Sequence, residues 1–182
     1  MKAISLFVCV LLLSCSGFSD MKDKLIQFKS KKIDIPYEMM NVYNCSMCPD
    51  TAKRPIMVVK YINNVNCGHC IAFDLLKMQE VISSLYGDCC GLICIIGGMS
   101  NSNIVKEFHD SHVNSEVYLD TCNAFLGANP QIPDNELFHT FVINNEGKVL
   151  MVGNPFQNEK MEALFKKVIA NEQKKHKTKK PV

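Results

Sequence analysis

The residues best suited to chemistry are two cysteines separated by two residues, Cys67 and Cys70. An apolar segment of strand character, residues 56–62, precedes them, and a segment with helical periodicity, residues 69–86, contains the second cysteine. A Cys-x-x-Cys at a strand-to-helix junction is typical of dithiol redox pairs, because two thiols in one helical turn can form a disulfide. The sequence therefore predicts a reversible dithiol–disulfide here. The alternative is a structural disulfide or two buried thiols.

Cys67 is the expected nucleophile of this pair. At a helix N-terminus, unpaired backbone N–H groups and the helix dipole favour a thiolate. A protonated His69, between the two cysteines, would add positive charge. Surroundings of this kind lower a cysteine pKa from about 8.5 to roughly 3.5–7.5. We expect Cys70 to be more buried and to resolve the mixed disulfide that Cys67 forms with a substrate.

The beginning of the chain has the pattern of an export signal. A basic start is followed by an apolar run over residues 3–13, which is too short to span a bilayer, and then by small residues. The run that ends in Leu-Ser-Cys15 also resembles the lipobox of bacterial lipoproteins, which implies that Cys15 is lipidated and anchors the protein to a membrane. The alternative is an ordinary signal peptide cleaved near Gly17, with no role for Cys15.

Length and charge fit one globular domain. The chain has 182 residues, enough for a single domain with a sizeable core. Its 20 basic and 18 acidic residues leave a formal net charge of +2, so the composition gives no reason to expect a nucleic-acid partner. The basic run from Lys174 onward is interpreted as a solvated, disordered end without a function of its own.

The remaining cysteines allow several pairings. An exported chain meets an oxidising compartment, where disulfides persist. Cys45 and Cys48 form a second Cys-x-x-Cys, but prolines follow it in place of a helix, so it is either a structural disulfide or an accessory pair that relays to Cys67 and Cys70. Cys94 lies in an apolar strand and is expected to be an inert core residue. Cys122 lies in the predicted long loop, and we expect it to form a disulfide with one of the adjacent cysteines at 89 and 90.

The predicted elements alternate between strands and helices. Strands are expected over residues 32–36, 56–62, 92–96, 116–119, 137–143 and 148–152, and helices over residues 69–86, 100–113 and 158–170. This order predicts an α/β fold, in which a right-handed parallel crossover and an antiparallel C-terminal hairpin share one sheet with helices on both faces. Lys60 is the only charged residue of the 56–62 strand, and it either extends to the sheet edge or tunes the thiolate.

This order, with Cys-Gly-His-Cys after the first central strand, resembles the thioredoxin fold. Within that superfamily it is similar to membrane-anchored thiol–disulfide oxidoreductases, and especially to envelope lipoproteins of Bacteroidetes-type bacteria. The run from Phe138 to Val149 is similar to the family's hairpin, in which a threonine precedes an apolar strand, a turn and Gly-Lys. We divide the chain into four parts: a signal over residues 1–15, a polar, lysine-rich linker or frayed helix over 16–31, a thioredoxin-like domain over 32–173 and a basic disordered tail over 174–182.

The resemblance also implies an activity and a location. The protein would exchange disulfides with exported cysteine-containing proteins or with a membrane redox partner, and would need no cofactor beyond its redox-active disulfide. It would face the periplasm or the cell exterior from a lipid anchor. Cys67, Cys70 and His69 would be catalytic, and Phe138, His139 and Thr140 would form the substrate-binding loop.

One departure from the family falls on that loop. The family places a cis-proline directly before the threonine, where this chain has His139. A cis bond before a residue other than proline costs about 2.5–4 kcal/mol, so the peptide bond before His139 is either trans or strained. Asn66 also replaces the aromatic residue that usually precedes the first cysteine.

His139 therefore has three possible roles. It is a hydrogen-bonded polar residue beside the site, a proton carrier for Cys70, or a metal ligand. In the last case Cys67, Cys70 and His139, with the further help of His69, would form a Zn or Cu site. The protein would then be a metal-binding or partner-binding lipoprotein of thioredoxin fold, without general oxidoreductase activity.

Overall fold

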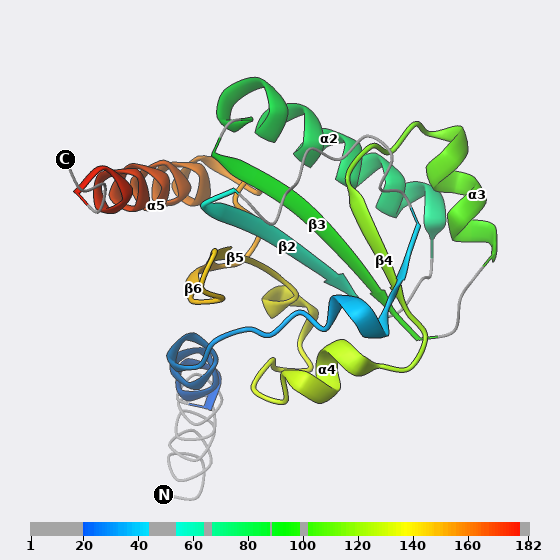
Figure 1. Cartoon of the computed structure of the whole chain (residues 1–182), viewed down its shortest axis with the longest axis horizontal. Coiled ribbons are helices and arrows are strands. Elements are labelled where there is room, and N and C mark those ends of the chain that lie inside the picture. The colour runs from blue at the N-terminus through cyan, green and yellow to red at the C-terminus, as the bar shows by residue number, and fades with distance from the viewer. Residues whose placement is uncertain (1–19, 44–53, 64–66, 88, 99–101, 179–182) are drawn as a thin grey trace, which may run out of the picture.

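A six-stranded sheet forms the centre of the computed structural model, with helices on both of its faces (Figure 1). The predictions for Cys15, Cys45 and Cys48 lie outside the residues that the structure describes, which are 20–43, 54–63, 67–87, 89–98 and 102–178.

The strands follow the order β1-β4-β3-β2-β5-β6 across the sheet. Neighbouring strands β2, β3 and β4 are parallel, whereas β5 runs antiparallel to β2, β6 to β5 and β1 to β4. The predicted combination of a parallel crossover and an antiparallel hairpin is therefore confirmed. The strands are β1 (Asn41–Val42), β2 (Ile56–Ile62), β3 (Cys90–Gly97), β4 (Glu116–Asp120), β5 (Thr140–Asn144) and β6 (Val149–Val152).

Helices cover the sheet from both sides. Residues 20–30 form a helix that precedes all the labelled elements, and we call it the N-terminal helix. None of the helices in the described ranges is long and apolar enough to cross a membrane. The other helices are α2 (Gly68–Tyr86), α3 (Ser102–Asp110), α4 (Ala124–Ala128) and α5 (Glu159–Thr178), with short 3-10 turns η1 (Tyr37–Met39) and η3 (Glu136–Phe138).

The central strand β2 is buried on both faces, as its nearly continuous apolar sequence predicts. Val58 packs in one core cluster with Leu75 of α2, and the same cluster includes residues of α3 and α5. Val59 belongs to the second cluster, on the opposite face, with Phe125 of α4 and Phe141 of β5. β2 therefore leads from the middle of the core to the redox pair.

The first correction concerns the predicted linker. Residues 20–30 form a helix whose Phe28 is completely buried, with its ring 5.2 Å from that of Phe141 in an edge-to-face arrangement. The segment therefore belongs to the domain, because its apolar face covers the sheet. Every strand and all residues of both core clusters lie between residues 28 and 169.

The second correction concerns the predicted strand over residues 32–36. Only Lys32 makes a β-bridge there, with Lys148, and the edge strands of the sheet are β6 and the two-residue β1. The chain runs instead against the β5–β6 turn, where the Ile33 N–H donates to the Gly147 carbonyl at 2.8 Å. Gly147 has a φ of +77°, as expected for a glycine in this turn.

Two further differences concern the C-terminal half. The segment over residues 120–136, predicted to be a loop, contains α4. α5 continues to Thr178, so the first residues of the tail that we predicted to be disordered are helical. Leu164 of this helix has 46% of its surface exposed.

Candidate redox site

The redox pair lies at the N-terminus of α2. Cys67 is the N-cap, with extended backbone, and its Sγ accepts the backbone N–H of Cys70 at 3.2 Å. The two cysteines form a disulfide with their Cα atoms 5.4 Å apart. The sulfur of Cys67 thus receives a helix N-terminal N–H group, the arrangement that favours a thiolate when the disulfide is reduced.

Both cysteines of the pair are exposed. For Cys70 this differs from the greater burial that we predicted. An exposed disulfide at the tip of a helix is open to attack by a thiolate on another protein.

His69 lies in solvent beside α3. Its side chain is 78% exposed, and its Nδ1 lies 3.7 Å from the Glu107 carboxylate. The aliphatic part of Glu107 also packs against Gly68, where a Cβ atom would lie 3.2 Å from Glu107 Cγ. Glu107 is therefore a carboxylate close to the redox pair that sequence reasoning missed, since nothing local links it to residues so far away in the chain.

His139 is buried rather than directed to solvent. It is 4% exposed, its preceding peptide bond is trans, and its Nε2 lies 3.0 Å from the Pro133 carbonyl. Its ring packs edge-on against Tyr61 at 5.2 Å. Of the three roles considered for His139, the hydrogen-bonded polar residue agrees with this geometry.

A metal site is not formed by the described residues. No group of three or more His, Cys, Asp and Glu side chains in these ranges is placed to hold a metal ion. In particular, the structure does not bring Cys67, Cys70 and His139 together as a ligand set.

A cavity of about 220 Å3 lies next to the redox helix. It is formed by the end of β2, the first turn of α2 and the start of β5, and its lining includes Ile71, which directly follows Cys70. Two of the three residues predicted to bind substrate, His139 and Thr140, line this cavity, whereas Phe138 is buried in the core and does not.

Lys60 lines the same cavity but is not a free charge. Its Nζ forms an ion pair with Asp74 of α2, and the side chains of Lys60 and Asp74 are 17% and 39% exposed. Lys60 is the neighbour of Cys94 across β2 and β3. Burial raises the pKa of the Cys94 thiol to about 12, so this thiol is inert, as predicted for a core residue.

The predicted disulfide between Cys122 and a cysteine at 89 or 90 is wrong. All three are free thiols. Cys89 and Cys90 lie at the beginning of β3, whereas Cys122 follows the end of β4, and these strands are parallel, so the thiols lie at opposite ends of the sheet.

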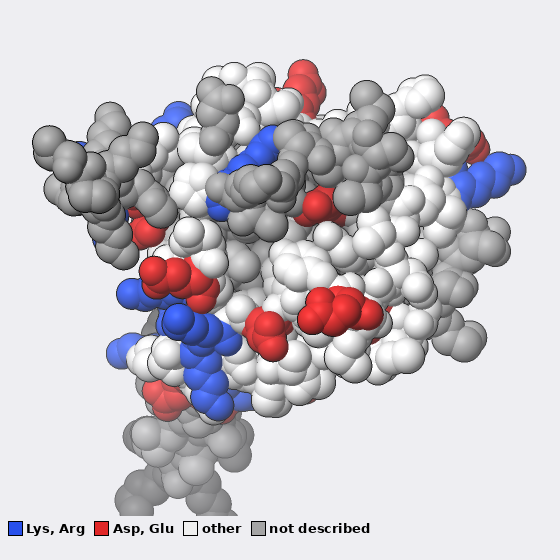
Figure 2. All heavy atoms as spheres, viewed as in Figure 1, with Lys and Arg blue, Asp and Glu red and all other residues white. Residues whose placement is uncertain are grey.

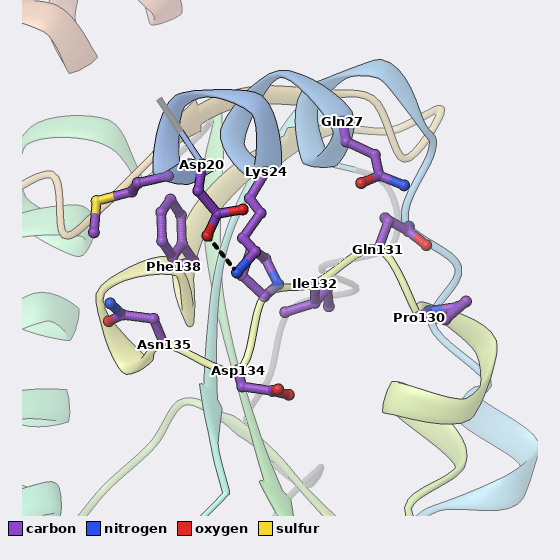
Figure 3. Close-up of a pocket in the computed structure, with 11 residues that line it drawn as sticks. Asp20, Lys24, Gln27, Pro130, Gln131, Ile132, Asp134, Asn135 and Phe138 are labelled. Atoms are coloured by element: carbon purple, nitrogen blue, oxygen red, sulfur yellow. Dashed lines mark ion pairs between the residues drawn. The ribbon is translucent and has the colours of Figure 1, made fainter. Parts of the chain in front are cut away.

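A larger pocket, of about 550 Å3, lies between the N-terminal helix and the 130–138 segment (Figure 3). The helix of residues 20–30 forms one wall, and Pro133 and Phe138 belong to the other. Lys24 forms an ion pair with Asp20 at 2.8 Å inside this region. No cysteine lines the pocket, so we do not assign it to the redox site. Across this pocket the N-terminal helix faces the segment whose Pro133 carbonyl accepts the His139 hydrogen bond.

Comparisons with known proteins define the fold. No protein-family model matches the chain, and no curated protein matches it. A protein of Chlorobium tepidum described as thiol:disulfide interchange protein DsbE is 14% identical, with a TM-score of 0.52 over 76% of this chain and 98% of that one. A domain of a Cytophaga hutchinsonii protein described as a thiol-disulfide isomerase is 13% identical, with a TM-score of 0.52 over 82% and 95%. Peroxiredoxin Q of Xanthomonas campestris is 11% identical, with a TM-score of 0.51 over 77% and 97%. The chain has the thioredoxin-like fold.

Proposed function

We propose that this protein is a thiol–disulfide oxidoreductase of the bacterial cell envelope. It acts through Cys67 and Cys70 on exported cysteine-containing proteins or on a membrane redox partner. The observation that carries the proposal is the exposed disulfide at the N-terminus of α2, in which Cys67 Sγ receives a backbone N–H. The activity needs no cofactor beyond this disulfide.

The exchange balances in electrons and protons. A substrate thiolate attacks Cys67 Sγ, the Cys67–Cys70 bond breaks, and its electron pair leaves on Cys70, which then takes up a proton. A second substrate thiolate attacks the substrate sulfur of this mixed disulfide and releases Cys67 as a thiolate. The substrate dithiol is oxidised to a disulfide and the protein disulfide is reduced. In the reverse direction Cys67 attacks a substrate disulfide and Cys70 resolves the intermediate.

The structure suggests why Cys67 is the attacking group. The N–H of Cys70 and the dipole of α2 stabilise its negative charge, and His69 adds to this when it is protonated. The Glu107 carboxylate, 3.7 Å from His69 Nδ1, would partly offset the positive charge of a protonated His69. A positive and a negative side chain therefore lie beside the redox pair.

Export and anchoring complete the proposal. The first 15 residues have the pattern of a signal that ends in a lipobox-like sequence, so Cys15 would carry the lipid. The Chlorobium tepidum and Cytophaga hutchinsonii proteins of similar fold are described as thiol–disulfide proteins, which supports the activity. Incorporation of labelled fatty acid by the full chain, and its loss in Cys15→Ser, would test the anchor.

The activity is tested by reduction of insulin with dithiothreitol as the electron donor. We expect the wild-type chain to accelerate the reaction and Cys67→Ser to abolish the acceleration. Cys122→Ser is the matched control, because Cys122 is an exposed free thiol outside the pair, and it should remain active. Equal activity of the wild type and Cys67→Ser would contradict the proposal.

A further inference from the structure

Lysine side chains from three segments gather at one end of the domain. Lys29, Lys148 and Lys175 line a cavity of about 320 Å3 around Glu172. Lys32 adjoins them, since it pairs with Lys148 in a β-bridge. We call these four lysines, all exposed, the basic face. Figure 2 shows blue side chains gathered over the N-terminal helix and beside β6, at the lower left of that view.

The charge of this face is positive. Among the residues that line the cavity, Glu172 is the one with a carboxylate; it is 5% exposed and forms an ion pair with Lys175. Three lysines against one carboxylate leave the lining of this cavity positively charged. Lys24 does not contribute, because Asp20 neutralises it in the separate pocket of Figure 3.

The basic face and the redox pair lie at opposite ends of β2. The β5–β6 turn with Lys148 follows Asn144, which pairs with Ile56 at the beginning of β2, whereas Cys67 follows the end of that strand. A strand of seven residues is about 20 Å long. Figure 1 agrees, since the N-terminal helix and the end of α5 lie on the left and the first turn of α2 lies on the right.

An apolar side chain accompanies the lysines on the N-terminal helix. Ile26 is 56% exposed and lies one helical turn from Lys29, whereas the opposite side of the same helix buries Phe28. A surface that combines lysines with exposed apolar residues suits the boundary between lipid headgroups and acyl chains. A nucleic-acid duplex would pair with the lysines but would leave the apolar surface beside them uncovered.

We propose that the basic face seats the domain on an anionic lipid surface, with the redox pair directed away from the bilayer. This rests on the proposed function in one respect: the bilayer is near because Cys15, the proposed lipid anchor, is five residues before Asp20. Attraction to anionic lipids and the lipid anchor then act on the same side of the molecule, and a single acyl chain by itself binds only reversibly.

Flotation with vesicles tests the inference. The chain from residue 16 onward lacks the lipidated cysteine and keeps all described residues. It is mixed with vesicles of phosphatidylcholine, either alone or with phosphatidylglycerol added. We expect binding to the anionic vesicles only, and its loss at high salt. Each lysine near such a surface contributes about fivefold to the binding constant, so Lys29→Gln with Lys148→Gln should weaken binding about 25-fold.

The matched control is Lys77→Gln with Lys106→Gln, which removes the same charge from exposed positions of α2 and α3. It should leave binding nearly unchanged. Equal weakening by both pairs, equal binding to both kinds of vesicle, or tighter binding to duplex DNA than to the anionic vesicles would overturn the inference. Insulin reduction measured on the same variants keeps the two proposals separate, because neither pair of lysines touches the redox site.

Discussion

The Nε2 of His139 lies 3.0 Å from the carbonyl oxygen of Pro133, and His139 donates this hydrogen bond because a carbonyl can only accept one. His139 occupies the position at which the thioredoxin resemblance expects a cis-proline. The bond ties the start of β5 to the 130–138 segment. Ile132 and Phe138 of that segment belong to the same core cluster as Phe28 of the N-terminal helix, which the sequence assigns to a linker.

Removal of this contact should weaken the fold. His139→Ala leaves the half-buried Pro133 carbonyl without its partner, and we expect the free energy of unfolding to fall by about 1–3 kcal/mol. His139→Pro should not keep the wild-type free energy of unfolding either. The backbone N–H of His139 donates to the Glu136 carbonyl at 3.0 Å, and a proline has no N–H. Urea unfolding of both variants provides the measurement. Wild-type stability of either would show that the contact is not needed.

The Lys60–Asp74 ion pair should stabilise the attachment of α2 to β2. Asp74→Asn leaves the mostly buried ammonium of Lys60 without its counter-charge, and we expect a loss of about 1 kcal/mol. The double variant Lys60→Met with Asp74→Asn should recover part of this loss, because no unpaired charge remains. Urea midpoints for the two variants decide the matter. An Asp74→Asn variant as stable as the wild type would mean that the pair contributes nothing.

Buried thiols should make the protein sensitive to alkali. Burial raises the pKa of both Cys90 and Cys94 to about 12, whereas unfolded cysteines titrate near 8.5. Between these values the unfolded state holds fewer protons, so the free energy of unfolding falls as the pH rises, by up to about 1.4 kcal/mol per pH unit for each thiol. Below pH 8 the two thiols cause no such loss.

Cys94→Val separates this effect from other alkaline titrations. It keeps an apolar side chain of similar size in β3 and removes one titrating group. Tyr61, whose pKa burial raises to about 12, still titrates in both proteins and serves as the common background. The alkaline decline in urea stability should be shallower in Cys94→Val. Parallel pH profiles would show that Cys94 is not the cause.

The N-terminal helix should be part of the folded domain. Phe28→Ala removes a completely buried ring that packs on Phe141, and losses of about 3–5 kcal/mol are typical of such changes. Ile26→Ala is the matched control on the same helix, at a position 56% exposed, and should cost little. If thermal unfolding responds equally to both variants, residues 20–30 are only the linker that the sequence predicts.

The sequence predicts best those elements whose signal is local. The apolar run of β2 and the helical periodicity of α2 are each visible within a single segment, and together with the cysteine spacing they place the redox pair. The helix of residues 20–30 is harder to identify, because polar lysine-rich residues hide the few apolar ones, such as Phe28, that it buries. α4 is likewise concealed in a stretch rich in Asn, Gly and Pro.

Contacts between distant segments set the limit on what can be predicted for the site. Nothing near His69 in the sequence indicates Glu107, and nothing near His139 indicates that the Pro133 carbonyl will accept its hydrogen bond. The exposure of Cys70 is likewise not visible in the local sequence. Such features arise from packing rather than from local pattern, so they appear only when the fold is complete.

The redox potential of the Cys67–Cys70 pair tests the central claim most directly. The protein would be equilibrated in glutathione buffers of graded potential, and its free thiols counted by alkylation and mass spectrometry, with Cys67→Ser as the baseline. We predict a reversible two-electron transition between about −270 mV and −180 mV, the range from thioredoxin to protein disulfide isomerase. A disulfide that stays oxidised below about −300 mV would be a structural one and would contradict the account.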